Sequence, residues 1–471
     1  MSGIIDRISK EAINNLFEEQ RKNNYINPDY YRRFDVKRGL RNADSTGVLA
    51  GLTRICSVEG YYIDDGERVP KDGKLIYRGI NMTEIVESCE KENRFGYEEV
   101  IYLLLFGVLP TERQLNLFKQ ILAECRELPE DFVEDMIMKV PSKNIMNKVA
   151  RCVLALYSYD EDPDNIDPAN VLRQCIQLIA QIPTIMAGAY QVKRRIFDKK
   201  SMYFHQNNPN LGFAESILRS IRADKQFTDE EAKLLDICLI LHADHGGGNN
   251  STFTTRCITS SGTDTYSAIA AGIGALKGPK HGGANIHVSE MTDDIKANVP
   301  DFTNEEKLKS YLNKILDKQA GDRSGLIYGM GHAVYTLSDP RAKILKRYAE
   351  KYSKIYGKEE DFELLSMIEK LTPGLLAERR GVNKKVCANV DLYSGLIYDM
   401  LGIPRDLFTP LFMSARVAGW SAHRIEEITS NGKIVRPAYK NVTIPRPYVP
   451  MSERAENFDM AQNEYISIEE R

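Results

Sequence analysis

Histidine side chains gather in one stretch of the sequence, between residues 242 and 295. Four of the seven histidines lie there, and these are His242, His245, His281 and His287. They fall at predicted helix ends and in glycine-rich turns such as HADHGGG and GPKHGG. Side chains at such positions meet incoming molecules more often than side chains on helix faces do. This stretch is therefore the first candidate for a site that binds or transforms a small molecule.

His281 lies between a helix predicted over residues 265–276 and a second helix that begins near Ala284. The positive end of a helix disfavours imidazolium, so the expected species is a neutral ring that donates one hydrogen bond. Such a donor suits an oxyanion or an enolate. From this motif alone, a histidine that only caps a turn remains an open alternative.

His242 and His245 stand three positions apart, a spacing that metal ligands use on helices. A zinc site needs a third protein ligand, and although His281 or His287 could be recruited, no HExxH-like pattern is present. His242 is explained more simply as a partner of the last carbonyls of its helix. We therefore predict no metal site, and a metal-dependent hydrolase remains a remote alternative.

A second group of polar residues follows in GMGHAVYTLSDPRAKIL, which contains His332 and Arg341. Asp339 and Pro340 fit the N-cap and the first position of a helix. Arg341 then lies in the first turn, where the helix dipole opposes a cation and an anionic partner is expected. A solvated surface arginine is the alternative.

Asp391, in CANVDLYSG, precedes another predicted helix. At such a position Asp391 or Asn389 is most often only the N-cap. Its neighbours Val390 and Leu392 are apolar, however, so partial loss of water would raise the basicity of the carboxylate, as proton abstraction requires.

Arg416 shares one stripe of an apolar helix with Phe412 and Trp420. A buried cation must be paired, and residues 407–423 contain no acid. Its partner is therefore expected from elsewhere in the fold or from a ligand. Arg436 precedes Pro437, which keeps it extended.

The elements that must position these groups are predicted to be mainly helices. Apolar residues at spacings of three and four predict helices over 4–24, 98–106, 134–138, 145–157, 171–190, 213–223 and 229–242. Short runs between Leu52 and Arg78, separated by DDG and KDG turns, predict a small antiparallel strand group. Strands are too few for a βαβ series, so the fold class is mainly α.

Composition narrows the class of protein further. The 471 residues include 63 basic and 66 acidic side chains, so the net charge of −3 favours neither nucleic acid nor an anionic membrane. Eight scattered cysteines without a CxxC pair indicate reduced thiols. Apolar runs stay far below the roughly 20 residues of a membrane span, and the N-terminus lacks a signal pattern. We predict a cytoplasmic protein.

Charge patterning suggests a division into domains. The helices predicted after residue 295 have wide charged faces, and the chain becomes apolar again beyond Gly402. We therefore predict a smaller helical domain over 288–400 inserted into a large helical domain. The large domain would comprise 1–287 and then 401–471, which ends in a C-terminal arm.

Taken together, the motifs resemble the citrate synthase family. The matching segments, in the family's order, are YRG at 77–79, HADHGGGN, GPKHGGAN, GMGHAVY with DPR, NVDLYSG, SARVAGW and RP at 436–437. They span residues from about 50 to 440. The resemblance implies a two-domain helical homodimer, an acyltransferase of the Si type that joins acetyl-CoA to oxaloacetate and releases citrate and CoA. Acetyl-CoA would be a co-substrate, and no permanently bound cofactor is implied.

The resemblance also implies roles for single residues. His281 would donate to the thioester oxygen, Asp391 would take the methyl proton, and His332 would polarise the ketone of oxaloacetate. His245, Arg341 and Arg416 would hold oxaloacetate, with Arg436 supplied by the second subunit. His242 and His287 would be structural.

The sequence departs from the family pattern at two positions. One concerns CoA binding, and the other lies in the turn before Asp391. Thr336 stands where members often carry Lys or Arg, so CoA would be held by other cations, with Lys343 as a candidate, or by main-chain contacts. Ala388 replaces a common proline. Two alternatives remain: 2-methylcitrate synthase, which uses propionyl-CoA with the same residues, and an inactive paralogue, which would be expected to lack His281, His332 or Asp391.

Overall fold

The chain forms two compact units, one of which contains both ends of the chain. The computed structural model describes residues 10–42, 44, 46–380, 385–430, 432–443, 445 and 447–454. Unit 1 comprises Met1–Leu49 and Arg436–Arg471, and unit 2 comprises Ala50–Val435. The helix predicted over 4–24 is present from residue 10 on, and residues 4–9 lie outside the described residues. The elements of unit 1 are α1 (Lys10–Asn23), α2 (Asp29–Arg33), η1 (Arg38–Leu40) and η5 (Met451–Glu453).

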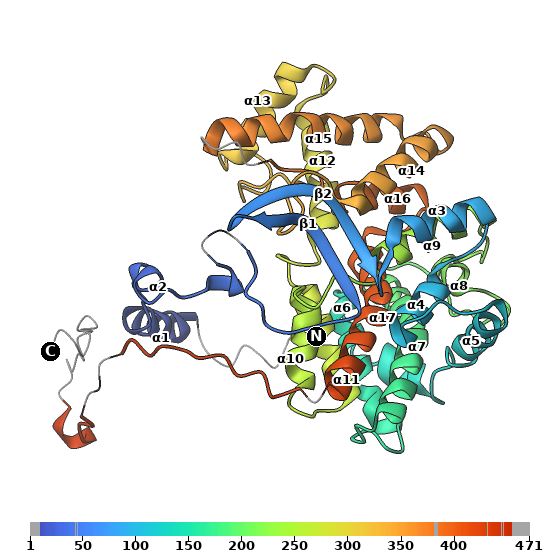
Figure 1. Ribbon diagram of the computed structural model, residues 1–471, viewed down its shortest axis with the longest axis horizontal. Helices are drawn as coiled ribbons and strands as arrows, with labels where there is room; N and C mark the ends of the chain where they lie inside the picture. The colour runs from blue at the N-terminus through green and yellow to red at the C-terminus, as the bar shows by residue number, and fades with distance from the viewer. Residues whose placement is uncertain are drawn as a thin grey trace. The chain divides into compact units, whose positions relative to one another are not determined.

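Unit 2 is mainly helical, which confirms the predicted fold class (Figure 1). Its helices are α3 (Met82–Glu92), α4 (Tyr97–Phe106), α5 (Glu112–Glu124), η2 (Val133–Met138), α6 (Ile145–Leu156), η3 (Tyr157–Tyr159), α7 (Pro168–Ile196), α8 (Phe213–Ile221), α9 (Asp229–His242), α10 (Asn250–Thr259), α11 (Thr265–Lys277), α12 (Ala284–Asn298), α13 (Glu305–Leu316), α14 (Pro340–Tyr356), α15 (Glu359–Arg380), α16 (Asp391–Met400), η4 (Arg405–Leu407) and α17 (Phe408–Thr429). None of the helices in the described ranges combines the length and apolar character that a bilayer crossing requires.

The predicted strand group is a hairpin of β1 (Cys56–Asp64) and β2 (Glu67–Tyr77), followed by the short β3 (Ile80–Asn81). Asp65 and Gly66 have positive φ and form the two-residue turn between the long strands, as the DDG signal predicted. The KDG turn prediction is wrong. Those residues lie inside β2, where the pairing slips between Glu59 and Tyr61 and the extra residues form a bulge.

The bulge has a partner in the loop that follows His332. The Gly73 N–H donates to the Ser338 hydroxyl, which in turn donates to Asp72. A Cβ on Gly60, which faces the bulge, would lie 2.6 Å from the Val334 carbonyl oxygen. The hairpin backbone therefore packs directly against the loop, and the apparent turn signal marks this close approach.

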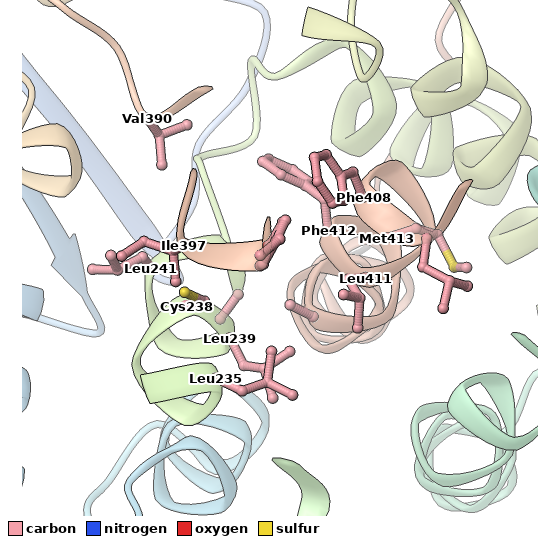
Figure 2. Close-up of a cluster of buried hydrophobic side chains, with 14 of the residues drawn as sticks. Leu235, Cys238, Leu239, Leu241, Val390, Ile397, Phe408, Leu411, Phe412 and Met413 are labelled. Atoms are coloured by element: carbon pink, nitrogen blue, oxygen red, sulfur yellow. The ribbon is translucent and has the colours of Figure 1, made fainter. Parts of the chain in front are cut away.

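Helix α17 runs through the core of unit 2. It packs against α4, α7, α9, α10 and α11, and residues 408–424 are all buried. In Figure 2, Phe408, Leu411, Phe412 and Met413 of α17 lie near apolar side chains of α9 and α16. Each such burial stabilises the fold by about 1.5–3 kcal/mol. The core thereby fixes the elements that carry the candidate site.

Local signals set the helix ends in this core. At the start of α9, the Thr228 hydroxyl accepts from the Glu231 N–H and the Glu231 carboxylate accepts from the Thr228 N–H, which confirms the predicted capping box. At the start of α14, Asp339 accepts from the Arg341 N–H, as predicted. The first cap begins the helix that leads to His245, and the second lies two positions before Arg341.

Helix α16 packs against α12, α14 and α15, and α15 packs against α12, α13 and α14. All of them belong to the same compact unit as the rest of 50–435. The predicted boundary after residue 287 falls within α12. The division into 1–287, 288–400 and 401–471 therefore remains a prediction.

Candidate active site

Six of the predicted site residues belong to unit 2 and influence one another. They come from six different places in the chain: His245 after α9, His281 between α11 and α12, His332 before α14, Arg341 in α14, Asp391 in α16 and Arg416 in α17. His245 lies among the others, because burial together with Arg341, His332, Arg416 and His281 lowers its pKa well below the usual value. His245 is therefore neutral.

His245 and His332 face each other, with their Nε2 atoms 3.0 Å apart. Nδ1 of His332 accepts the backbone N–H groups of Val334 (3.1 Å) and Tyr335 (3.2 Å). Backbone N–H groups only donate, so the ring proton of His332 is assigned to Nε2. His245 accepts it, and the His245 proton lies on Nδ1, which is buried without a hydrogen-bond partner in the described structure. His332 thus presents an N–H donor at the centre of the cluster.

His281 is also neutral, but for a different reason from the one predicted. Burial, with help from Arg416, lowers its pKa to about 4. The helix predicted after it is α12, yet Nε2 contacts the first turn of α10, where the Ser251 N–H donates to it at 3.3 Å. The ring proton is therefore assigned to Nδ1. The Ser251 hydroxyl, 3.0 Å from Nε2, also receives the indole N–H of Trp420.

Asp391 is the first residue of α16, and its carboxylate is not the cap. The Asp391 N–H donates to the side chain of Asn389 at 3.0 Å, and Nδ2 of Asn389 donates to the Gly331 carbonyl at 2.8 Å. Asn389 therefore ties α16 to the His332 loop and leaves the half-buried Asp391 carboxylate free of capping. Burial raises its pKa to about 6, although Arg341 and Arg416 act in the opposite direction.

Arg341 finds the anionic partner that its position requires in its own N-cap. Its Nε and Nη2 donate to the two carboxylate oxygens of Asp339 at 3.0 and 2.7 Å, and both side chains are buried. Burial opposes the cation, but Asp339 raises the pKa of Arg341. The guanidinium is therefore charged and rigidly oriented.

Arg416 is buried with most of its hydrogen-bonding capacity unused. Its Nε donates to the His242 carbonyl at 2.6 Å, and its guanidinium carbon lies 4.7 Å from the centre of the Phe412 ring. Nη1 and Nη2 have no hydrogen-bond partner among the described residues. Burial lowers the pKa of Arg416, and the nearby Asp244 favours its charged form. These two nitrogens are suited to receive an anion.

The two remaining histidines of residues 242–295 have partners close by in the structure. Nε2 of His242 lies 3.0 Å from the Tyr398 hydroxyl, so the prediction that its ring bonds the last carbonyls of α9 is wrong. Arg416 takes the His242 carbonyl instead. His287 pairs with Glu290 and stacks on Tyr328. Groups of three or more His, Cys, Asp or Glu that are arranged to hold a metal are absent from the searched, described residues.

Two of the predicted residues, Arg436 and Lys343, are exposed. Arg436 belongs to unit 1. Lys343, the guess for a CoA phosphate, donates to Asp72 at 3.2 Å. The hydroxyl of Thr336 is buried without a hydrogen-bond partner in the ranges that the structure describes.

Three buried residues that the sequence motifs did not indicate support the cluster. Ser251 sets the tautomer of His281, Asp244 lies near Arg416, and His423 lies 3.3 Å from Asp244. Two signals were available. Asp244 stands between His242 and His245, and His423 follows Arg416 by seven positions, which places both on one face of α17.

The arrangement defines a class of protein: an enzyme with neutral histidine donors, one carboxylate base and buried arginines, suited to proton transfer at a carbonyl substrate that carries carboxylates. A family model described as the citrate synthase C-terminal domain matches residues 43–438. The chain therefore belongs to the citrate synthase family.

Individual relatives agree with this membership. The chain is 35% identical over 421 residues to the citrate synthase of Synechocystis, a match that covers 89% of this chain and 94% of that protein. It is 31% identical over 422 residues to 2-methylcitrate synthase 1 of Corynebacterium glutamicum, covering 89% and 98%. A solved ternary complex of Thermoplasma acidophilum citrate synthase with carboxymethyl coenzyme A and oxaloacetate superposes with TM-score 0.70 at 26% identity, covering 89% and 99%.

Proposed function

We infer that this chain condenses acetyl-CoA with oxaloacetate and hydrolyses the resulting thioester to citrate and CoA. The observation that carries this inference is the presence, near Arg416, of both a carboxylate with a raised pKa and a neutral histidine. Asp391 has a pKa of about 6 and is ionised at neutral pH, while His281 has a pKa of about 4 and offers an N–H on Nδ1. The methyl protons of a thioester are very weakly acidic, so both groups must act together.

In the first step, Asp391 takes a methyl proton while His281 donates a hydrogen bond to the thioester oxygen. The enolate carbon then attacks the ketone of oxaloacetate, which the Nε2–H of His332 polarises once the ketone oxygen replaces His245 as its acceptor. A carbon–carbon bond forms, and the ketone oxygen takes the Nε2 proton of His332. Water then attacks the citryl thioester and breaks the carbon–sulfur bond. Its hydroxyl goes to the acyl carbon, its proton restores His332, and the proton held by Asp391 goes to the departing CoA sulfur. Domain closure would exclude bulk water until that stage.

The charge of the second substrate explains the arginines. Oxaloacetate carries two carboxylates, and bidentate pairing with a guanidinium fixes both charge and orientation. We assign Arg416, with its two unused nitrogens, and Arg341, oriented by Asp339, to these carboxylates. His245 completes this contact within unit 2.

The proposal also covers the oligomeric state and the cellular location of the protein. We infer a homodimer in which Arg436 reaches the site of the second subunit, and a cytoplasmic location. The free state of all eight cysteines supports a reducing compartment. Acetyl-CoA acts as co-substrate, and the cations that meet its phosphates remain to be assigned.

The second candidate is 2-methylcitrate synthesis from propionyl-CoA, favoured by the likeness to the Corynebacterium glutamicum enzyme. One methylene changes binding by only about 1–3 kcal/mol in an apolar pocket. The deciding experiment measures kcat/KM of the purified chain for acetyl-CoA and propionyl-CoA with oxaloacetate. We expect a preference for acetyl-CoA. A preference for propionyl-CoA would exchange the two assignments, and turnover of neither would refute both.

A further inference from the structure

Asp244 and Arg416 carry opposite charges in the buried part of the site. Asp244 is completely buried and Arg416 is 1% exposed. Even so, Oδ1 of Asp244 and both terminal nitrogens of Arg416 have no hydrogen-bond partner among the residues that the structure describes. Arg341 differs, because both oxygens of Asp339 bond it directly. Two nitrogens of Arg341 are thus occupied by its counter-ion, whereas both terminal nitrogens of Arg416 stay open.

Two contacts hold Oδ2 of the Asp244 carboxylate in place, and the buried Cys56 thiol is a further hydrogen-bonding neighbour of this side chain. Its Oδ2 accepts the Gly246 N–H at 2.9 Å and lies 3.3 Å from Nε2 of His423. On the other side of the His423 ring, Arg256 donates to Nδ1 at 2.9 Å. Because a guanidinium only donates, the His423 proton is on Nε2 and points to Asp244.

Arg256 is itself anchored at the far end of this chain of contacts. Its Nη1 lies 2.7 Å from Glu426 and its Nη2 lies 2.8 Å from Glu427, both near the end of α17. Arg416 and His423 belong to the same helix, so the donor that restrains Asp244 and the arginine that Asp244 serves move as one body. The contacts of Arg256 with Glu426 and Glu427 therefore fix His423 from the side opposite Asp244.

We propose that His423 is a positioning residue: it holds Asp244, the counter-ion of Arg416, in place and so leaves both terminal nitrogens of that arginine for a substrate carboxylate. The inference rests on the proposed function, in which Arg416 binds oxaloacetate. A carboxylate released from His423 would rotate toward Arg416 and form the direct ion pair that Arg341 already shows. That pair would compete with the substrate.

The test compares oxaloacetate binding by calorimetry, in the absence of acetyl-CoA, across variants of the full chain. His423→Phe removes the donor, so we expect affinity to fall by about tenfold or more, as for a lost charge-assisted contact. In turnover assays, KM for oxaloacetate should rise more than kcat falls. His423→Gln keeps one donor and one acceptor, and should bind like the wild type.

The double variant Asp244→Asn, His423→Phe supplies the decisive comparison. With no carboxylate left to occupy Arg416, we expect it to recover the affinity that His423→Phe loses. Asp244→Asn alone should bind oxaloacetate at least as tightly as the wild type while melting at a lower temperature. Asp236→Asn is the matched control, because Asp236 is a buried acid of α9 that bonds Gly96 and Tyr97 instead, and its affinity for oxaloacetate should not change.

Equal losses of affinity in His423→Phe and in the double variant would overturn the proposal, since a merely structural role predicts additive damage. Should His423→Phe not fold, Asp244→Asn still decides: an affinity loss there as large as that of Arg416→Ala would also overturn it. Failure of the proposed function is a separate result. In that case the wild-type chain itself would neither bind oxaloacetate nor form citrate.

Discussion

Among the individual residues, burial sets the protonation of the groups assigned to catalysis. It raises the pKa of the Asp391 carboxyl to about 6 and, with Arg416, lowers that of His281 to about 4. The two shifts leave an ionised base and a neutral donor, both influenced by Arg416, at neutral pH. The sequence suggested both states from the apolar neighbours of Asp391 and the turn around His281, but not that Arg416 contributes to both.

Asp391→Asn should abolish turnover and leave oxaloacetate binding largely intact, because the carboxylate is assigned to proton removal only. Loss of a general base lowers kcat by at least about a hundredfold. Steady-state assays with calorimetry of oxaloacetate measure both quantities. Asp399→Asn, on the same helix, is the control and should retain turnover. An Asp391→Asn protein that turns over but no longer binds oxaloacetate would contradict the role.

The pH dependence of kcat/KM should report the ionisation of Asp391. The base must be unprotonated, so activity is lost as pH falls through about 6 and is complete above it. His281 titrates at about 4, too low to set this limb. A profile measured from pH 5 to 8 should therefore bend near 6. A flat profile across that range, with the protein still folded, would remove Asp391 from the mechanism.

At the scale of helices and strands, the residues that cap a helix were predictable from the sequence. Contacts between segments that lie far apart in the chain were not. Capping residues such as Thr228 and Asp339 act on their own helix, so the sequence locates those helix starts. The KDG segment looks like a turn, yet Gly73 is required because the loop carrying Ser338 presses against β2. Likewise the need of Arg416 for a partner was visible, but Asp244 becomes its neighbour only when α9 and α17 pack.

At Gly419 the backbone of α17 contacts the end of α9 directly. The Gly419 N–H donates to the Ala243 carbonyl at 3.1 Å, and an added Cβ would lie 2.5 Å from that oxygen and would also strike Asp244. Gly419→Ala should therefore lower the free energy of unfolding by about 1–3 kcal/mol and weaken oxaloacetate binding. Chemical denaturation measures the first effect.

The control for this prediction is Gly374→Ala in α15. Gly374 is exposed within a helix, and a Cβ there meets open space, so stability should stay equal or rise by up to about 1 kcal/mol. If both variants had the same stability as the wild type, the contact between α17 and the Asp244 segment would not be tightly packed.

At the scale of the whole molecule, the predicted site residues are divided between the two units. Arg436 is exposed and belongs to unit 1, which unites the two ends of the chain. No sequence pattern indicates which subunit a flanking arginine serves, because that depends on how two copies meet. Only the family resemblance assigns Arg436 to the second subunit, so this part of the site needs a direct experiment.

Mixed dimers can decide where Arg436 acts. Arg416→Ala and Arg436→Ala should each raise the KM for oxaloacetate, since each removes a carboxylate contact. If Arg436 crosses the interface, a dimer with one copy of each variant has one site with both lesions and one intact site. Random reassortment should then restore about a quarter of wild-type activity at low oxaloacetate. If Arg436 served its own subunit, every site would carry one lesion and no activity would return. A third preparation combines a chain that carries both substitutions with a wild-type chain and calibrates the result. If Arg436 crosses the interface, each of its mixed dimers has two sites with one substitution each.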